Sequence, residues 1–344
     1  MIPSNFYPKV RLLAIVGGLA LAACVLGLMA THKPAESAFP GGNGKIAFDS
    51  FPATGSEDND TEIYTITSDG KVLKKLTNDP YEDLNPTFSA DGRRIAFSSN
   101  RHRLTDYDIF TMNTGGTGLK NVTNNSAPLN EGAPAWSPNG QKIAFERFGN
   151  PVYESEVSIY VRKADGTKER RLTEDTGVTR SSNPSWSPDG SKIVFDTNRE
   201  GPPENDTVGT DLWVMNANGT GERKFFTDLL AQDCNREQPD WSPDGTRVVF
   251  VYRCQDAPPP EGNGIYVADS DGSDQKRLVG PGRSPVWSPN GQKIAFVRLP
   301  DDENATQVDV FVMRSDGTNV TNYTNTPEVD EGSPSWQPVI APSG

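Results

Sequence analysis

The sequence is poor in the residues that carry most metal and nucleophile chemistry. Its 344 residues include two His and three Cys, too few for a zinc site built from imidazoles and thiolates. It contains no Gly-x-Ser-x-Gly turn, no Walker A loop and no dinucleotide-binding glycine pattern. A Ser-His-Asp triad would depend on His102, because His32 lies outside the repeats described below. These absences argue against the common motif-defined hydrolases and nucleotide-dependent enzymes.

Positive charge is also in short supply. The sequence has 33 Lys and Arg against 46 Asp and Glu, a formal net charge of −13, and a pI of about 4.7. Nucleic-acid binding depends on Lys and Arg that neutralise phosphates, so a nucleic-acid partner is excluded. The same balance disfavours contact with an anionic membrane surface.

One long uncharged stretch, residues 12–30, follows Lys9 and Arg11 near the N-terminus. Its length suits a bilayer span, and its basic flank suits a secretory signal. Three alternatives stay open: an uncleaved membrane anchor, a lipoprotein signal lipidated at Cys24 of Leu21-Ala22-Ala23-Cys24, or a signal peptide cleaved near Ala30. Each of them exports the rest of the chain. We expect residues 31–41 to form a linker, and the protein to lie on the periplasmic or extracellular side, tethered to the membrane only through residues 12–30.

A block of the form Pro-x-Trp-Ser-Pro-Asp-Gly-x-x-Ile-x-Phe recurs along the sequence. Five copies start at Pro86, Pro134, Pro184, Pro239 and Pro285, and a truncated sixth copy ends at Trp336. The aromatic residues of the five copies are Phe88, Trp136, Trp186, Trp241 and Trp287, at spacings of 46 to 55 residues. Self-similarity at this period is typical of a propeller built blade by blade.

Each repeat predicts four strands, here called a to d. Strand a carries the Pro-x-Trp, a Pro-Asp-Gly or Pro-Asn-Gly turn leads to the alternating strand b, and a second Gly turn separates strands c and d. Strands b to d occur six times, but a complete set from a to d occurs five times. We therefore expect an all-β, six-bladed propeller over residues 42–338, in which the C-terminal strand joins blade one and closes the ring, with residues 339–344 as a tail. The repeated Trp residues should pack between blades.

The two faces of such a disc differ in sequence. The a–b and c–d turns, which form the turn face, are short and nearly identical. The b–c and d–a connections, which form the loop face, vary in every blade and together hold 29 acidic against 9 basic residues by our predicted boundaries. Binding residues tend to lie on variable loops held by a rigid scaffold, and a field of one sign attracts oppositely charged partners. The loop face is therefore the predicted binding surface; plain solvation of the loops is the alternative.

Charged residues just before each strand a should surround the mouth of the central channel on the loop face. These candidate binding residues are Glu82, Asp83, Glu131, Arg180, Arg236, Glu237, Arg283, Asp330 and Glu331. Mixed acids and arginines suit a protein or peptide partner that is cationic or offers a free carboxylate. Alternatively, these charges pair with one another.

Two further sites follow from the strand register and the loops. If Trp241 pairs with Arg247, Cys234 lies opposite Cys254, and an oxidising compartment would join them in a disulfide.

Calcium is the only metal worth considering, because residues 269–274 partly imitate a calcium loop. That segment lacks the bidentate Glu and occupies an ordinary c–d turn, and the acids at Glu57, Asp58, Asp60 and Glu62 form a weaker candidate. We predict no catalytic residues, no metal site and no cofactor, with calcium at the channel mouth as an open alternative.

The five Pro-x-aromatic blocks, with their Gly turns, resemble the TolB-type β-propeller repeat, a relative of the WD repeat. The resemblance covers nearly all of residues 42–338 and implies a propeller with an envelope-associated scaffold role. Proteins named TolB carry an α/β domain before the propeller, whereas residues 1–41 here are expected to form a hydrophobic segment and a linker, a departure that puts their role in the Tol–Pal system in doubt for this chain. Since one fold serves many functions, we expect a non-catalytic binding scaffold. The alternatives are a propeller lyase or calcium-dependent hydrolase of a carbohydrate or lactone acting at the channel mouth, and a purely structural or storage role.

Overall fold

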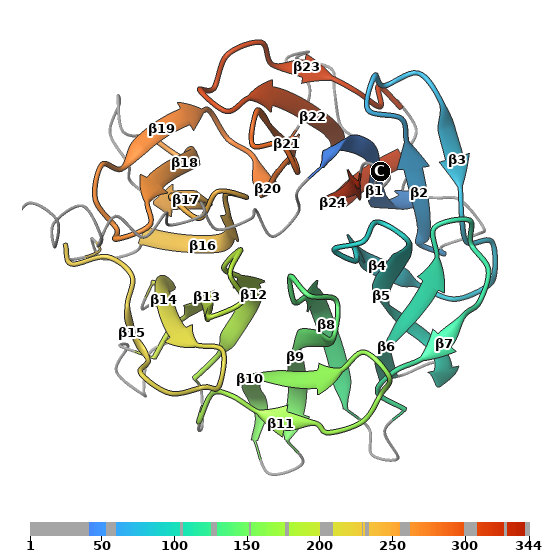
Figure 1. Ribbon diagram of the computed structural model, residues 1–344, viewed down its shortest axis with the longest axis horizontal. Helices are drawn as coiled ribbons and strands as arrows, with labels where there is room; N and C mark the ends of the chain where they lie inside the picture. The colour runs from blue at the N-terminus through green and yellow to red at the C-terminus, as the bar shows by residue number, and fades with distance from the viewer. Residues whose placement is uncertain are drawn as a thin grey trace, which may run out of the picture. The chain divides into compact units, whose positions relative to one another are not determined.

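The computed structural model describes residues 41–52, 60–103, 106–124, 129–150, 153–175, 179–199, 209–228, 230, 234–254, 262–298, 308–326 and 329–340. Within these ranges the chain forms six antiparallel sheets of four strands, arranged as the blades of a propeller (Figure 1). Blades one to three, from the inner strand outward, are β24 (Val329–Val339), β1 (Gly42–Pro52), β2 (Glu62–Ile66) and β3 (Leu73–Lys75); β4 (Asp83–Phe88), β5 (Arg94–Arg103), β6 (Asp106–Asn113) and β7 (Lys120–Asn121); β8 (Asn130–Trp136), β9 (Lys142–Asn150), β10 (Tyr153–Lys163) and β11 (Arg170–Arg171). Blades four to six are β12 (Ser181–Trp186), β13 (Lys192–Thr197), β14 (Asp211–Asn216) and β15 (Arg223–Lys224); β16 (Cys234–Trp241), β17 (Arg247–Cys254), β18 (Gly264–Asp269) and β19 (Lys276–Val279); β20 (Arg283–Trp287), β21 (Lys293–Arg298), β22 (Asp309–Arg314) and β23 (Thr321–Asn322).

The core lies between the blades. Each inner-strand aromatic residue is at most 8 % exposed, and each packs on the apolar face of a neighbouring sheet; Trp241 of blade five, for instance, joins Val194 and Val214 of blade four. Strand-b residues such as Phe97 and Phe250 are fully buried. The predicted packing of the repeated Trp between blades is confirmed.

Every inner strand contains a β-bulge at the same place. The residue before the Pro of each repeat has a left-handed conformation with φ between 37° and 53°, and the pairing with strand b shifts there. The following Pro has no N–H to donate, which the structure accommodates because the inner strand is a sheet edge facing the channel. The six residues with this conformation are Asn85, Ala133, Asn183, Gln238, Ser284 and Ser333.

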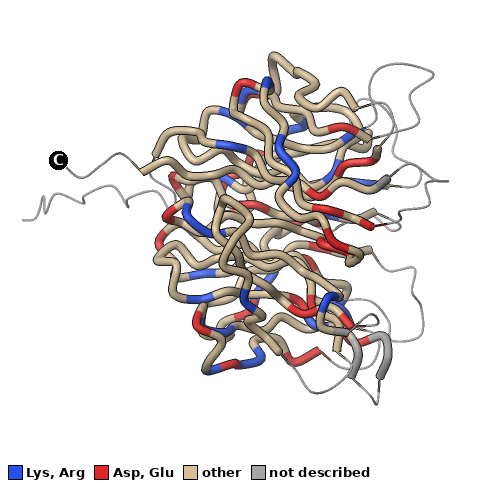
Figure 2. The backbone as a smooth tube through the Cα atoms, turned by 90° about the vertical axis from the view of Figure 1, so that its right-hand side faces the viewer, with Lys and Arg blue, Asp and Glu red and all other residues tan. Residues whose placement is uncertain are grey.

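The first and last described strands lie side by side. β24 pairs with β1, with Gly42 opposite Val339 and Ile46 opposite Trp336, so the C-terminal strand is the inner strand of blade one. This pairing is the contact that the predicted closure of the ring requires. The chain enters β1 and leaves β24 on the turn face, which faces the viewer in Figure 1 and lies to the left in Figure 2.

Several connections predicted as loops are strands. β5 continues to Arg103 and β6 begins at Asp106, β9 and β10 fill most of residues 146–157, and β16 already begins at Cys234. Backbone pairing extends these hairpins beyond the repeated motif, so the loop face has fewer free loop residues than the sequence suggested. The hydrophobic segment 12–30, with Cys24, lies outside the described residues. No helix among the described residues could span a membrane.

Candidate functional site

The central channel is lined by the same short segment from all six inner strands. Its cavity has a volume of about 240 Å³. Each blade contributes its left-handed residue, the following Pro and the residue before the aromatic. At that last position the blades in order present Ser335, Thr87, Ala135, Ser185, Asp240 and Val286. These six side chains are small, one of them is a carboxylate, and the prolines and aromatic residues of the same segments line the rest of the cavity.

Side chains of the preceding blade accept hydrogen bonds from the free edges of the inner strands β4, β12, β16 and β20. The Asn85 N–H donates to Asp49 Oδ2 at 2.6 Å, and the Gln238 N–H donates to Asp196 Oδ2 at 2.8 Å. Asp240 repeats the arrangement, accepting from the Trp287 N–H at 2.8 Å. An unpaired buried N–H is costly, so these acids stabilise the contact between blades.

Burial raises the pKa of the acids in these inter-blade contacts. Loss of solvation raises the pKa of Asp49 and Asp196 to about 6 and that of Asp240 to about 7. For Glu146, which accepts from the Asn183 N–H at 3.3 Å, burial and then the charge of Asp196 raise the pKa to about 7. All four carboxyl groups therefore favour the protonated form more than ordinary side chains do.

Four of the predicted mouth residues are buried inside the blades. Asp83 and Glu331 have no exposed surface, and Glu131 and Arg236 are at most 3 % exposed. Asp83 accepts two hydrogen bonds from Arg101 at 2.6 and 2.7 Å. Glu131 pairs with an arginine of strand β9. Arg236 of blade five pairs with Asp211 of blade four and with Asp228, which follows that blade, and Glu331 accepts from a backbone N–H of β22 at 2.9 Å. Their prediction as partner contacts is corrected: they stabilise the blades.

Five of the predicted mouth residues keep exposed surface on the loop face. Arg180 and Arg283 are exposed, while Glu82, Glu237 and Asp330 are half-buried. Glu237 pairs with Arg253, and Asp330 accepts from the Val308 N–H at 2.7 Å. These five residues, which we call the mouth residues below, retain the mixed charge that was predicted.

The buried acids are paired by arginines that we did not predict. Arg101 lies over Phe97, Arg147 over Tyr160 at 4.1 Å and Arg199 over Trp213 at 4.9 Å. Arg147 binds both Glu131 and Glu169, and Arg199 binds Asp175 and Glu222. A sequence signal was available, because in blades two, three, four and six an Arg follows the strand-b Phe by two or four residues, on the same face of the strand.

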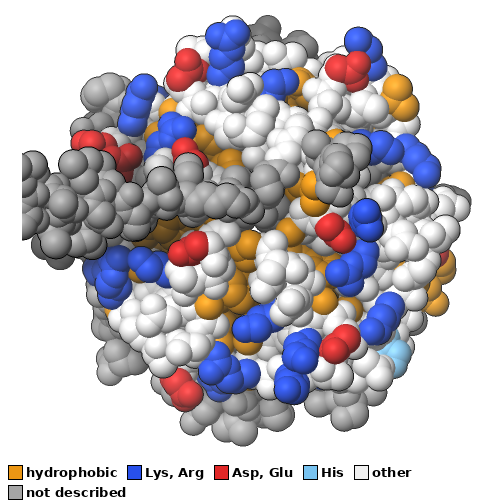
Figure 3. Space-filling view, viewed as in Figure 1, with side chains coloured by type: hydrophobic (Ala, Val, Ile, Leu, Met, Phe, Trp, Pro, Cys, Tyr) orange, Lys and Arg blue, Asp and Glu red, His pale blue; other side chains and the backbone are white. Residues whose placement is uncertain are grey.

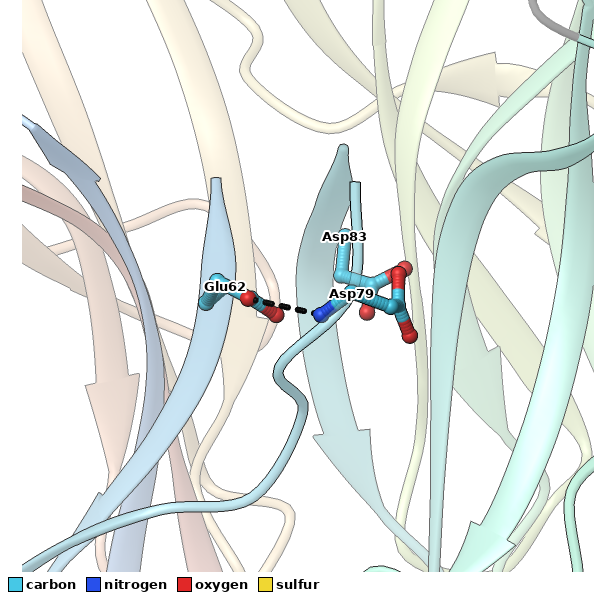
Figure 4. Close-up of side chains that lie close together, drawn as sticks. All are labelled: Glu62, Asp79 and Asp83. Atoms are coloured by element: carbon cyan, nitrogen blue, oxygen red, sulfur yellow. Dashed lines mark hydrogen bonds between the residues drawn. The ribbon is translucent and has the colours of Figure 1, made fainter. Parts of the chain in front are cut away.

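Among the described residues, one group of acidic side chains lies close enough together to share a cation: Glu62, Asp79 and Asp83 (Figure 4). Two cationic side chains already contact them: Arg101 bridges Asp79 and Asp83, and Lys75 lies 3.1 Å from Glu62. Glu62 Oε2 and Asp79 Oδ1 remain without hydrogen bonds beside a cavity of about 320 Å³. A metal ion here would have to compete with the side chains of Arg101 and Lys75. Of the acids predicted as a weak calcium candidate at residues 57–62, this group includes only Glu62, and Glu57 and Asp58 lie outside the described residues.

Two other sequence features have structural roles. In the 269–274 segment, Asp271 Oδ1 accepts from the Ser273 N–H at 2.9 Å, so its carboxylate closes the c–d turn. Cys234 and Cys254 lie opposite each other in β16 and β17 and are joined by a disulfide. This bond links the two strands at the loop face, next to the mouth residues.

The family of the TolB beta propeller domain matches residues 117–256. A TolB homologue of Chlorobium luteolum is 34 % identical over 92 residues, which cover 26 % of this chain and 20 % of that protein. The chain therefore aligns with about a fifth of the length of this relative.

Two of the solved structures that share the fold illustrate the range of proteins built on it. The crystal structure of TolB from Acinetobacter baumannii has a TM-score of 0.69 at 20 % identity, covering 86 % of this chain and 67 % of that one. An oligogalacturonate lyase in complex with manganese has a TM-score of 0.54 at 13 % identity, covering 83 % and 86 %. At these identities the likeness concerns the fold alone.

Proposed function

We propose that this chain, a TolB-type β-propeller protein, is a non-catalytic scaffold that binds a protein or peptide partner at the loop-face mouth of its channel. The observation that carries this proposal is the set of mouth residues, two exposed arginines among half-buried acids on the loop face. Arginine offers a two-pronged hydrogen bond to a carboxylate, and the acids favour a basic side chain nearby. The partner is accordingly a segment that carries both charges or ends in a free carboxylate.

The proposal includes an exported, envelope-associated location. Residues 12–30 would provide the signal or tether, and the disulfide between Cys234 and Cys254 suits an oxidising compartment. The pairing of β24 with β1 would close the ring, so the mouth residues would be held by a continuous scaffold.

Affinity capture from a host envelope extract tests the proposal. One bait is the wild-type chain, the second carries Arg180→Glu and Arg283→Glu, and the third carries Glu82→Lys and Glu237→Lys. Arg223→Glu with Arg314→Glu, two exposed arginines of the turn face, forms a control with the same change of charge as the second bait. We expect a protein retained by the wild type and by the control but lost from both mouth variants. Retention by all four baits would contradict binding at the mouth.

A second candidate, a propeller lyase or metal-dependent hydrolase of a carbohydrate or lactone, is favoured by the orphaned oxygens of Glu62 and Asp79 and by the fold of the manganese-bound lyase. Isothermal titration with calcium or manganese tests it, with Asp79→Asn as the variant. Heat of binding that disappears in the variant would support the enzyme; no heat in the wild type would reject a metal at this position.

A further inference from the structure

The turn face carries an uneven charge. In blades one to three, the segments that form it (residues 42–45, 67–74, 89–94, 113–120, 137–142 and 163–170) contain ten Lys or Arg and four Asp or Glu. The corresponding segments of blades four to six (residues 187–192, 216–223, 242–247, 269–276, 288–293 and 314–320) contain six and seven. Positive side chains are prominent on this face in Figure 3. The acidic chain therefore has a basic sector, which we call the basic sector of blades one to three.

Exposed aliphatic side chains accompany this positive charge. Six large hydrophobic residues are exposed among those the structure describes, and Phe51 is the one near the loop face. The other five lie on the turn face in blades one and two: Val72 (61 % exposed), Leu73 (45 %), Leu119 (47 %), Val339 (47 %) and Ile340 (53 %). Single exposed apolar residues need no explanation, but their concentration in one sector does.

These segments are neighbours in space. Lys74 Nζ lies 3.5 Å from the Gly115 carbonyl, which joins the c–d turns of blades one and two. Lys120 Nζ donates to the Asp165 carbonyl at 2.8 Å, which joins blades two and three. Gln337, beside Val339, donates to the Gly92 carbonyl at 2.8 Å. Lysines and aliphatic side chains therefore form one connected surface.

The path of the chain brings this surface to the end from which the N-terminal segment departs. β1 begins at Gly42, beside Val339, on the turn face. Residues 31–41 can span at most about 40 Å when fully extended, so the tether proposed at residues 12–30 would attach to the propeller at its turn face. This step rests on the proposed function, in which residues 12–30 are the tether.

We propose that the basic sector of blades one to three docks on an anionic phospholipid surface. Lysines attract anionic headgroups while neighbouring aliphatic side chains enter the boundary between headgroups and acyl chains, a combination that defines interfacial membrane binding. An acidic polypeptide would pair with the lysines, whereas a lipid surface accommodates both the lysines and the aliphatic side chains beside them. Docking in this orientation points the mouth residues away from the membrane, toward partners in solution.

Vesicle co-sedimentation tests the proposal. All six sheets lie within residues 41–340, and residues 36–344 form one compact unit, so the propeller is used as residues 31–344, without the hydrophobic segment. We expect binding to phosphatidylglycerol vesicles, little binding to phosphatidylcholine vesicles, and loss of binding in 0.5 M salt, where charges are screened beyond about 4 Å. Lys71→Glu, Lys74→Glu and Lys120→Glu together should weaken binding at least about tenfold.

The matched control is Lys192→Glu, Arg223→Glu and Lys276→Glu, three exposed cations of the turn face in blades four and five. It makes the same change of charge and should retain binding.

Val72→Ser with Leu119→Ser should weaken binding without a change of charge, and unfolding curves establish that each variant is folded. Equal binding to both lipids, no binding to either, or equal loss in the control would overturn the proposal. Binding to poly-glutamate but not to vesicles would assign the surface to an acidic polypeptide instead. Partner capture at the mouth residues is measured in solution without vesicles, so either proposal can fail alone.

Discussion

The loop face and the turn face use charge in opposite ways. On the loop face, Asp83 and Glu131 are buried and hydrogen-bonded within their own blades, and Glu331 of blade one is buried against β22 of blade six. On the turn face, aspartates close the turns, as Asp244 does by accepting from Ser242 Oγ at 2.6 Å, while most lysines stay exposed. Acidic residues gather toward the right-hand end of Figure 2, where the loop face lies. The net charge of the sequence therefore overstates the number of acidic side chains that a partner can reach, and it conceals a basic surface on the turn face.

The largest effect is expected when the scaffold that separates the faces is opened. Deleting residues 329–344 removes β24, with Trp336, and exposes the paired edge of β1. We expect loss of cooperative thermal unfolding and aggregation, because an unpaired edge strand invites association. Deleting residues 341–344 alone is the control and should leave the unfolding curve unchanged. A β24 deletion that still unfolds cooperatively would show that the ring does not need its last strand.

Arg147→Met should be the most damaging single substitution on the loop-face side. It leaves Glu131 buried without its cation, and an uncompensated buried charge costs about 3–5 kcal/mol. Chemical denaturation measures the free energy of unfolding. Arg93→Met, an exposed arginine of the turn face, should change it by less than about 0.5 kcal/mol. Similar losses in the two variants would remove the distinction between the faces.

Breaking the bond between Cys234 and Cys254 should cost somewhat less. The two cysteines enclose a loop of 20 residues in sequence separation, and a disulfide of this size stabilises by about 3 kcal/mol, mainly by restricting the unfolded chain. The double variant with Ser at both positions should unfold at lower denaturant concentration. Thiol labelling of the folded, oxidised protein is the independent check, and labelling of both cysteines would contradict the bond.

The inter-blade carboxyl groups predict that stability falls as pH rises. Burial raises the pKa of Glu146 to about 7, so between about pH 4.5 and 7 the folded chain binds a proton that the unfolded chain has released. The stabilising contribution is complete below the unfolded pKa and is lost as pH rises through the folded one. For this shift it amounts to at most about 3 kcal/mol.

Glu146→Gln separates this effect from the rest of the chain. The amide stays neutral, so the fall in unfolding free energy between pH 5 and pH 8 should be smaller in the variant than in the wild type. Asp69→Asn is the control, because Asp69 lies in an exposed turn and its pKa is lowered to about 2 by bonds to Thr67 and Lys71. Parallel pH profiles for the wild type and Glu146→Gln would contradict the raised pKa.

The repeat could be predicted from the sequence, but the roles of its charged side chains could be predicted only in part. The aromatic of each block, the Gly turns and the alternating strand b predicted six blades, and the structure has six four-stranded sheets. The predicted opposition of Cys234 and Cys254 is confirmed, but the pairing of Trp241 with Arg247 from which it was counted is wrong: Trp241 pairs with Val248, and a bulge between Glu237 and Asp240 shifts the register by one residue. Asp83 and Glu131 were placed at the mouth because sequence gives position along a strand; it does not give the partner that turns a side chain inward. Arg101 and Arg147 decide that direction, and both come from the next strand.

The sequence by itself determined the fold class, the number of blades and the strand order. The spacing of the repeats and the alternation of apolar residues are local patterns that can be followed along the chain. Only the tertiary structure decided which charges face water. Pairing between blades satisfies the free N–H groups of the inner strands with Asp49, Asp196 and Asp240. Packing within blades buries Asp83 and Glu131 against arginines, and the pairing of β1 with β24 places Gly42 beside Val339 on the turn face. These contacts link residues far apart in sequence, and their free energies depend on burial, which no local pattern encodes.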